Sequence, residues 1–137
     1  MKIVIIDGQG GKIGCLLVEK IKASSIGADI FAIGSNSIAT SSMLKAGADF
    51  GATGENPVVV NCADADFIVG PLGIIVANSL LGEITPKMAV AVSESKAHKL
   101  LLPVNKCNNF IIAISDISLS QMIAQTVDKI LELIQLS

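Results

Sequence analysis

A glycine-rich loop that begins with an acid is the first place in this sequence where chemistry is expected. It follows an apolar run over residues 2–6 and precedes an apolar helical pattern that starts at Cys15. Glycines let a ligand approach the backbone closely, and a helix N-terminus presents unpaired N–H groups with partial positive charge. The pattern predicts a site for a phosphate or another small anion, formed by Asp7, Gly8, Gln9, Gly10, Gly11, Lys12 and Gly14.

The spacing of these glycines is related to the dinucleotide-binding fingerprint but differs from its standard form. Two variants of the fingerprint fit, and Lys12 stands where the loop of short-chain dehydrogenases has its middle glycine. A tight turn that binds nothing has the same pattern, so the preceding strand and the following helix carry the prediction. Asp7 would repel an anion unless a cation or the loop amides neutralise it. We expect Asp7 to accept hydrogen bonds from its own loop, and we predict no metal site.

The end of the second predicted strand lacks the acid of a classical NAD site. That acid lies about 20 residues beyond the loop and binds the ribose hydroxyls. Here the residues are Ser35, Asn36 and Ser37, and the chain has no arginine to bind a 2′-phosphate. Ser37 is expected to cap the next helix, and Asn36 to lie near a sugar or polar head group. A nucleotide or dinucleotide is the expected cofactor class, with little support for classical NAD recognition.

Residues suited to acid–base or nucleophilic chemistry are few. Glu55, Lys106 and Cys107 are the catalytic candidates, in a small enzyme whose site would be completed by a second copy of the chain. Glu83 is a further acid, and Thr85 before Pro86 has the pattern of a helix N-cap. Tyrosine is absent from the chain, which excludes the catalytic tyrosine of short-chain dehydrogenases.

The three cysteines are odd in number, widely spaced and in no CxxC pattern. They are Cys15, Cys62 and Cys107. This spacing argues against a disulfide framework and against a zinc site, so reduced thiols are expected.

The elements that must position these residues alternate between strand and helix, which is typical of a parallel sheet. Because the strands are uniformly apolar, we predict a three-layer α/β/α sandwich with a Rossmann-like, mostly parallel sheet. The gap after the fifth strand is too short for a crossover helix, so the last strand, 110–114, is expected to return antiparallel. The other predicted strands lie near 2–7, 29–34, 48–52, 66–70 and 99–104, and the helices near 12–24, 37–46, 56–63, 73–81, 86–97 and 118–135.

Parallel strands bring their carboxyl ends to one edge of the sheet, where open α/β sheets bind ligands. Small and polar residues concentrate in the loops at that edge. Beyond the first loop, the predicted binding residues are Ser35, Asn36, Ser37, Thr53, Gly54, Glu55, Asn56, Gly70, Pro71, Gly73 and Asn105.

Length and composition restrict the classes of function. The 137 residues fit one domain over 1–137, and 51% of them are hydrophobic. All ten basic residues are lysines and the net charge is −2, so nucleic acid is not an expected partner. No apolar run approaches the roughly 18 residues that span a bilayer, and the N-terminus has no signal-peptide pattern. We expect a cytoplasmic protein that does not bind membranes.

Self-association is expected from the apolar helices. The run over 118–135 and the run over 73–81 carry more apolar residues than one sheet-facing stripe needs, with Leu133 and Leu136 beyond that stripe. A symmetric homodimer would cover them.

Several blocks of the sequence, taken together, resemble a small bacterial family known only as a domain of unknown function, with uncharacterised Rossmann-like members. The blocks begin at Ile6, Asn36, Met43, Gly51, Gly70, Gly82 and Pro103. Lys12 departs from the family's loop, where a third consecutive glycine would fit. The resemblance implies the fold and no activity.

Three hypotheses follow for the function. The leading one is binding of a nucleotide or other small anionic metabolite at the first glycine loop. The alternatives are the dimer-completed enzyme and a scaffold without a ligand, in which Asp7 caps the loop amides.

Overall fold

A parallel sheet of five strands forms the centre of the computed structural model, which describes residues 1–104 and 108–137. The strand order is β3-β2-β1-β4-β5, which is the Rossmann order, with the switch point between β1 and β4. The α/β class and the parallel sheet predicted from the sequence are confirmed. The strands are β1 (Lys2–Asp7), β2 (Asp29–Gly34), β3 (Phe50–Thr53), β4 (Phe67–Pro71) and β5 (His98–Leu102).

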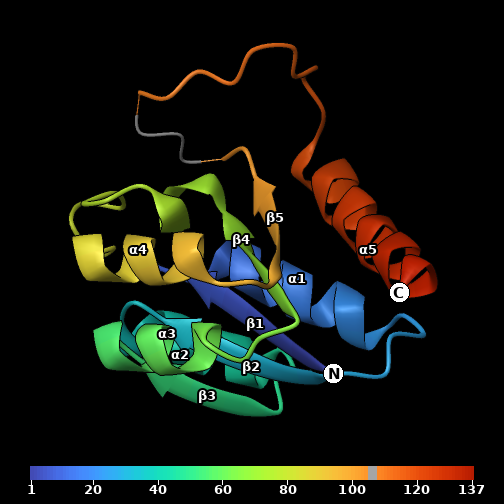
Figure 1. The fold of residues 1–137 in the computed structure, drawn as a ribbon, viewed down its shortest axis with the longest axis horizontal. Coiled ribbons are helices and arrows are strands. Elements are labelled where there is room, and N and C mark those ends of the chain that lie inside the picture. Colours follow the sequence, from blue (N-terminus) through green and yellow to red (C-terminus); the bar gives the residue numbers. More distant parts are fainter. Residues whose placement is uncertain (105–107) are drawn as a thin grey trace.

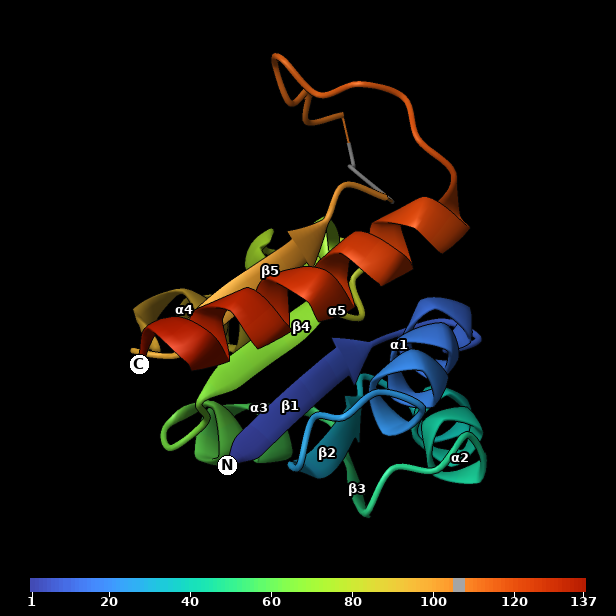
Figure 2. The same ribbon diagram turned by 90° about the vertical axis from the view of Figure 1, so that its right-hand side faces the viewer.

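Helices connect the strands and cover both faces of the sheet (Figures 1 and 2). Successive side chains along β1 point to opposite faces of the sheet. Ile3 and Ile5 pack with α1, α2 and α5 on one face. Val4 and Ile6 pack with α3 and α4 on the other face. Within the described ranges, none of the helices combines the length and the apolar character needed to cross a membrane. The helices are α1 (Lys12–Lys22), α2 (Ser37–Lys45), α3 (Glu55–Cys62), the 3₁₀ turn η1 (Leu72–Ile75), α4 (Pro86–Glu94) and α5 (Leu119–Leu136).

The prediction of a helix over 73–81 is wrong beyond the first turn. Only η1 forms, and residues 76–85, which we call the strap, follow it as turns. Asn78, Leu80 and Leu81 adopt left-handed backbone conformations there, and the Asn78 amide donates to the Ile84 carbonyl at 2.7 Å. These tertiary contacts decide the local structure, because a short apolar run favours helix and strand about equally.

The prediction of an antiparallel last strand is also wrong. Residues 110–114 contain no strand, and the described sheet is parallel throughout. The segment 108–118, which we call the arm, extends away from the sheet before α5 begins (Figure 1). An apolar β-rich sequence needs a partner strand for its backbone groups, and the arm has none within the described part of its own chain.

The N-cap of α2 differs from the expected residue by one position. Asn36, not Ser37, caps the helix, with its Oδ1 atom accepting from the Ala39 amide at 2.9 Å. Asparagine and serine are about equally good caps, so the sequence alone did not decide between them. The predicted cap at Thr85 is confirmed, with Pro86 as the first helical residue.

Candidate functional site

The glycine loop joins β1 to α1 at the carboxyl edge of the sheet. Its turn depends on Gly11, which caps α1 in a left-handed conformation with φ of 74°. A Cβ atom on this residue would lie 2.9 Å from Ala39 Cα, which is backbone of α2. Only glycine fits here, because the position combines a left-handed backbone with a close helix–helix approach. The loop therefore holds the start of α1 close to α2.

The Asp7 carboxylate accepts hydrogen bonds from two amides of this loop, which we call the inner amides. Its Oδ1 atom accepts from the Gly8 amide at 2.8 Å and its Oδ2 atom from the Gly14 amide at 2.7 Å. Burial raises the pKa of this carboxyl, and the nearby charge of Glu83 raises it further, while the two amides oppose both effects. The side chain is only 4% exposed, so the helix N-terminus is partly neutralised from inside the protein.

Glu83, in the strap, reaches the same loop from outside. Its Oε1 atom accepts hydrogen bonds from the Gln9 amide at 2.9 Å, from Ser35 Oγ at 2.7 Å and from Asn36 Nδ2 at 2.7 Å. Partial burial raises the pKa of Glu83, but the three donors outweigh it and the pKa lies below its usual range. Among the described residues, none donates to Oε2. A fixed carboxylate thus stands at the ends of β1 and β2 with one oxygen unengaged.

Contacts on either side of Glu83, at Leu80 and at Thr85, hold the strap in this place. Leu80 is buried against the loop, since a Cβ atom on Gly8 would lie 2.9 Å from Leu80 Cδ1. On the other side, Thr85 Oγ1 donates to Glu55 Oε2 at 2.6 Å. The strap therefore contacts the loops that follow β1 and β2 and the first residue of α3.

Two further backbone donors of the loop are already engaged. Gly11 donates to the Gly8 carbonyl at 2.9 Å, and Gln9 donates to Glu83. Within the described residues, the amides of Gly10 and Lys12 have no acceptor, and a Cβ atom on Gly10 would meet nothing within 4 Å. An external anion has access to these two amides and not to those that Asp7 occupies.

Some of the predicted loop residues form hydrogen bonds with Glu83, and the others make contacts within the fold. Ser35 and Asn36 meet Glu83, as described above. Thr53 bonds Thr40 at 2.7 Å, and Gly54 caps α3 with φ of 104°. Ser37 and Asn56 lie in the first turns of α2 and α3.

The residues after β4 belong to the core. A Cβ atom on Gly70 would clash with the Ile6 carbonyl of the neighbouring strand, so this glycine allows β4 to pack beside β1. Pro71 and Gly73 are buried next to it. Asn105, Lys106 and Cys107 lie outside the described residues.

The catalytic candidates gain no support from the described residues. Glu55 is exposed and bonded to Thr85, and it lines none of the pockets described below. Burial raises the pKa of the Cys62 thiol to about 11 and also raises that of Cys15, so neither is activated as a nucleophile.

Glu83 is the site residue that sequence reasoning placed least well. The sequence marks it as an acid, but the expected helix over 73–81 gives no reason for it to reach β2. The only local signal was the Thr85–Pro86 cap, which fixes the start of α4 three residues after Glu83. A carboxylate thus lies at the end of the second strand, although it comes from a loop remote in sequence.

Of the pockets found in the described residues, the one between α1 and α5 reaches the loop at Lys12, and the others lie away from it. One of about 450 Å³ lies between β5, α5 and the arm, and another of about 560 Å³ lies between α1 and α5. Within the part of the chain that is described, no three His, Cys, Asp or Glu side chains are placed to hold a metal ion. Ser35, Leu80 and Glu83 occupy the space beside Gly8, where even an added Cβ atom would clash.

Comparison with known proteins gives a family and no activity. No curated protein is significantly similar to the chain in sequence. One similar solved structure is the dodecameric FMN-dependent Ubix-like decarboxylase from Escherichia coli O157:H7, with 11% identity and a TM-score of 0.47 over 98% of this chain and 95% of that chain. The sequence matches the DUF3842 family, a domain of unknown function, over residues 2–135. The chain belongs to this family, as its glycine loop and its later blocks suggested.

Proposed function

We propose that the chain binds a nucleotide or a similar small metabolite that carries both hydroxyl groups and a negative charge. The site is the carboxyl edge of β1 and β2. Glu83 takes the part that the acid after the second strand has in dinucleotide-binding folds, which is to accept hydrogen bonds from sugar hydroxyls.

The observation that carries the proposal is the fixed carboxylate of Glu83. Three donors converge on Oε1, and the lowered pKa keeps the group ionised at neutral pH. The unengaged Oε2 is an acceptor suited to a hydroxyl donor, because hydrogen bonds to charged acceptors are about twice as strong as neutral ones.

The charged part of the ligand must avoid two carboxylates. Asp7 occupies the inner amides, so the anion is assigned to the outer donors, the amides of Gly10 and Lys12 and the Lys12 ammonium. This arrangement favours a single phosphate or carboxylate over a pyrophosphate lying across the whole loop, as in the classical site.

Calorimetry and thermal shift with mononucleotides, dinucleotides and phosphorylated sugars test the proposal. Glu83→Gln should weaken binding about 10- to 100-fold, the loss expected for a hydrogen bond to a charged group. Glu94→Gln, an exposed acid at the end of α4, is the matched control and should leave affinity unchanged.

A second pair of variants addresses the loop. Gly10→Asp places a carboxylate over the outer amides without a clash and should abolish binding, whereas Gly10→Ala should fold equally well. Gly11→Asp is unsuitable, because a side chain there would meet the backbone of α2. If no compound of the panel shifts the melting temperature of the wild type, the proposal is wrong.

The hypothesis of a scaffold without a ligand has one observation in its favour. Asp7 accepts from Gly8 and Gly14, so part of the loop serves the fold itself. On this hypothesis Gly10→Asp and Glu83→Gln change stability alone, and no metabolite binds.

A further inference from the structure

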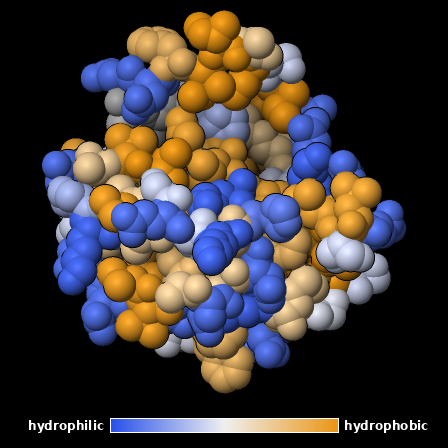
Figure 3. Space-filling model, viewed as in Figure 1, coloured by the Kyte–Doolittle hydropathy of each residue, from blue (hydrophilic) through white to orange (hydrophobic). Residues whose placement is uncertain are grey.

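The arm carries an apolar surface that its own chain leaves uncovered. Phe110 is 84% exposed and Ile112 is 87% exposed, and Ile111 and Ile114 are exposed by about 40% each. Figure 3 shows hydrophobic atoms gathered at the top of the molecule, where Figure 1 places the arm. Large apolar side chains gathered in this way mark an interaction surface rather than ordinary scattered exposure.

The sequence of the arm is that of a strand. Residues 110–114 read Phe-Ile-Ile-Ala-Ile, which has high β-propensity and no charge. Such a segment pairs with the edge of a sheet when one is available.

The sheet offers an open edge close to the arm. β5 pairs with β4 on one side, and no described strand pairs with its other side. Lys99 is the type of residue that discourages edge pairing, but its ammonium donates to the Ser95 carbonyl at 2.6 Å. This contact holds the Lys99 charge against its own chain.

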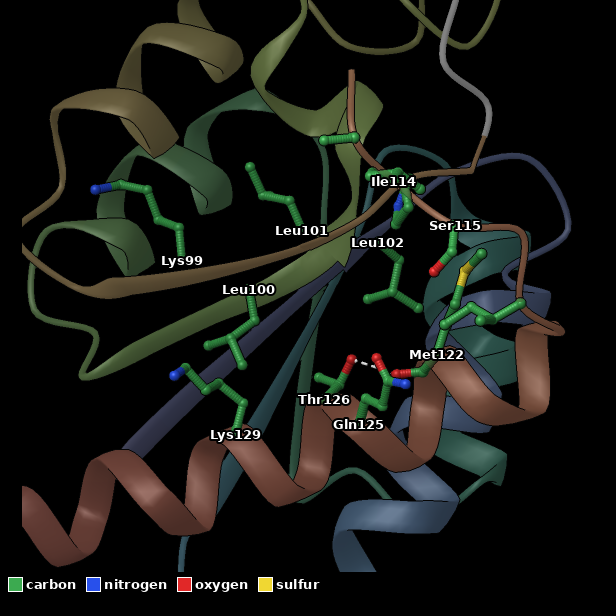
Figure 4. Close-up of a pocket in the computed structure, with 13 residues that line it drawn as sticks. Lys99, Leu100, Leu101, Leu102, Ile114, Ser115, Met122, Gln125, Thr126 and Lys129 are labelled. Carbon is green, nitrogen blue, oxygen red and sulfur yellow. Dashed lines mark hydrogen bonds between the residues drawn. The ribbon is translucent and has the colours of Figure 1, made fainter. Parts of the chain in front are cut away.

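A pocket of about 450 Å³ adjoins this edge (Figure 4). Leu100 and Leu102 of β5 point toward α5, where Met122 and Thr126 form the opposite wall. The chain's own arm also lines the pocket, through Ala113, Ile114, Ser115 and Ile117, and Lys99, Gln125 and Lys129 add polar groups to its walls. The pocket is suited to apolar side chains from a strand lying beside β5.

We propose that two copies of this chain exchange their arms. In each copy, Phe110 and Ile112 enter the pocket of the other copy, and the arm backbone pairs with the outer edge of β5. The exchange is symmetric, because each copy presents both the arm and the surface that receives it.

The apolar area involved reaches the lower limit for a specific dimer. A fully buried large apolar side chain removes roughly 100 Å² from water, so the exposed parts of the four side chains amount to about 250 Å² per arm. Counting both arms and the surfaces that receive them, the exchange buries about 1,000 Å², which is the lower limit for a specific interface. Backbone pairing at two edges adds hydrogen bonds to this contact.

The interface differs from the one expected from the apolar helices. The apolar face of α5 packs on its own sheet, where Ile123, Val127 and Ile130 are buried. Leu136 remains exposed by 75% at the end of the helix. It provides a matched control, since it is equally apolar and lies outside the arm.

Sedimentation and light scattering over micromolar concentrations test the exchange. The wild type should have twice its 14.1 kDa chain mass. Ile112→Lys should raise the dimer dissociation constant at least about tenfold, because it places a charge in an apolar pocket. Leu136→Lys should leave the constant unchanged. A wild-type mass of one chain overturns the proposal, and so does a dimer that Leu136→Lys dissociates and Ile112→Lys does not.

Hydrogen exchange on the wild type provides a second measurement that needs no variant. The outward amides of β5 should be protected in the dimer and become exchangeable on dilution below its dissociation constant. If the protection of these β5 amides does not depend on protein concentration, the arm folds back on β5 of its own chain. That result would also overturn the exchange between copies.

Discussion

Asn36 Nδ2 donates a hydrogen bond to Glu83 Oε1 at 2.7 Å, although 47 residues separate the two positions. Asn36 also caps α2 through its Oδ1 atom, so one side chain links the start of a helix to the strap. The contact fixes the rotamer of both residues. It places a carboxylate where the sequence offers only serine and asparagine.

Glu83→Gln should lower the free energy of unfolding by about 1–2 kcal/mol at pH 7, since three donors lose a charged acceptor that is partly open to water. The pKa of Glu83 is lowered in the folded protein, so its contribution is complete above the usual value of 4.5. It is lost as the pH falls through the folded pKa. Urea unfolding between pH 3 and pH 7 should therefore show the two proteins converging in acid. A difference that is the same at every pH would contradict the prediction.

Asp7→Asn should have the opposite dependence on pH. Burial, the largest cause, raises the pKa of Asp7 above its usual 3.8. The folded protein therefore holds this proton more tightly than the unfolded chain does. The contribution of Asp7 is complete below pH 3.8 and is lost as the pH rises through the folded pKa. The stability of the wild type relative to Asp7→Asn should thus decrease with rising pH.

Gly70→Ala and Gly10→Ala should differ sharply in stability. The added methyl at Gly70 meets the Ile6 carbonyl and, at 3.0 Å, Ile74 Cδ1. We expect a loss of about 1–3 kcal/mol, as for overpacking in other cores. At Gly10 the methyl meets nothing within 4 Å, so stability should stay the same or rise by about 0.5 kcal/mol. Thermal unfolding of the two variants measures the difference, and equal losses would show that the loop is packed.

Cys62 should resist alkylation in the folded protein. Its pKa of about 11 leaves only about one thiol in a thousand ionised at pH 8, and the side chain is buried against the core. Mass-spectrometric mapping after iodoacetamide treatment should find Cys62 unmodified until urea unfolds the chain. Rapid native labelling of Cys62 would indicate local opening between α3 and α4.

The strands could be predicted from the sequence because their signal is local. β1 and β2 have the predicted bounds, since each is an apolar run that ends at Asp7 or Gly34. The strap could not be predicted in this way. Its path depends on Leu80 packing against Gly8 and on Glu83 finding donors in two other loops, and all of these contacts are remote in sequence.

The glycine loop shows the same limit at the level of the site. Its place after β1 and before α1 followed from the sequence pattern, and the expectation that Asp7 would bond its own loop agrees with the structure. Which amides remain accessible did not follow, because Gln9 is engaged by a residue 74 positions away. The arm is a further case, in which a strand-like sequence lacks a partner within the described chain.

The position of Glu83 also has a consequence for how the molecule unfolds. β4 and β5 form one half of the sheet and β1 to β3 the other, and the strap after β4 bonds to loops of the other half. Separation of the halves would break the pairing of β1 with β4 and expose the Glu83 carboxylate together with its donors. Opening of the sheet between β1 and β4 therefore also breaks the contacts of the strap, which favours a single cooperative transition without a half-folded species.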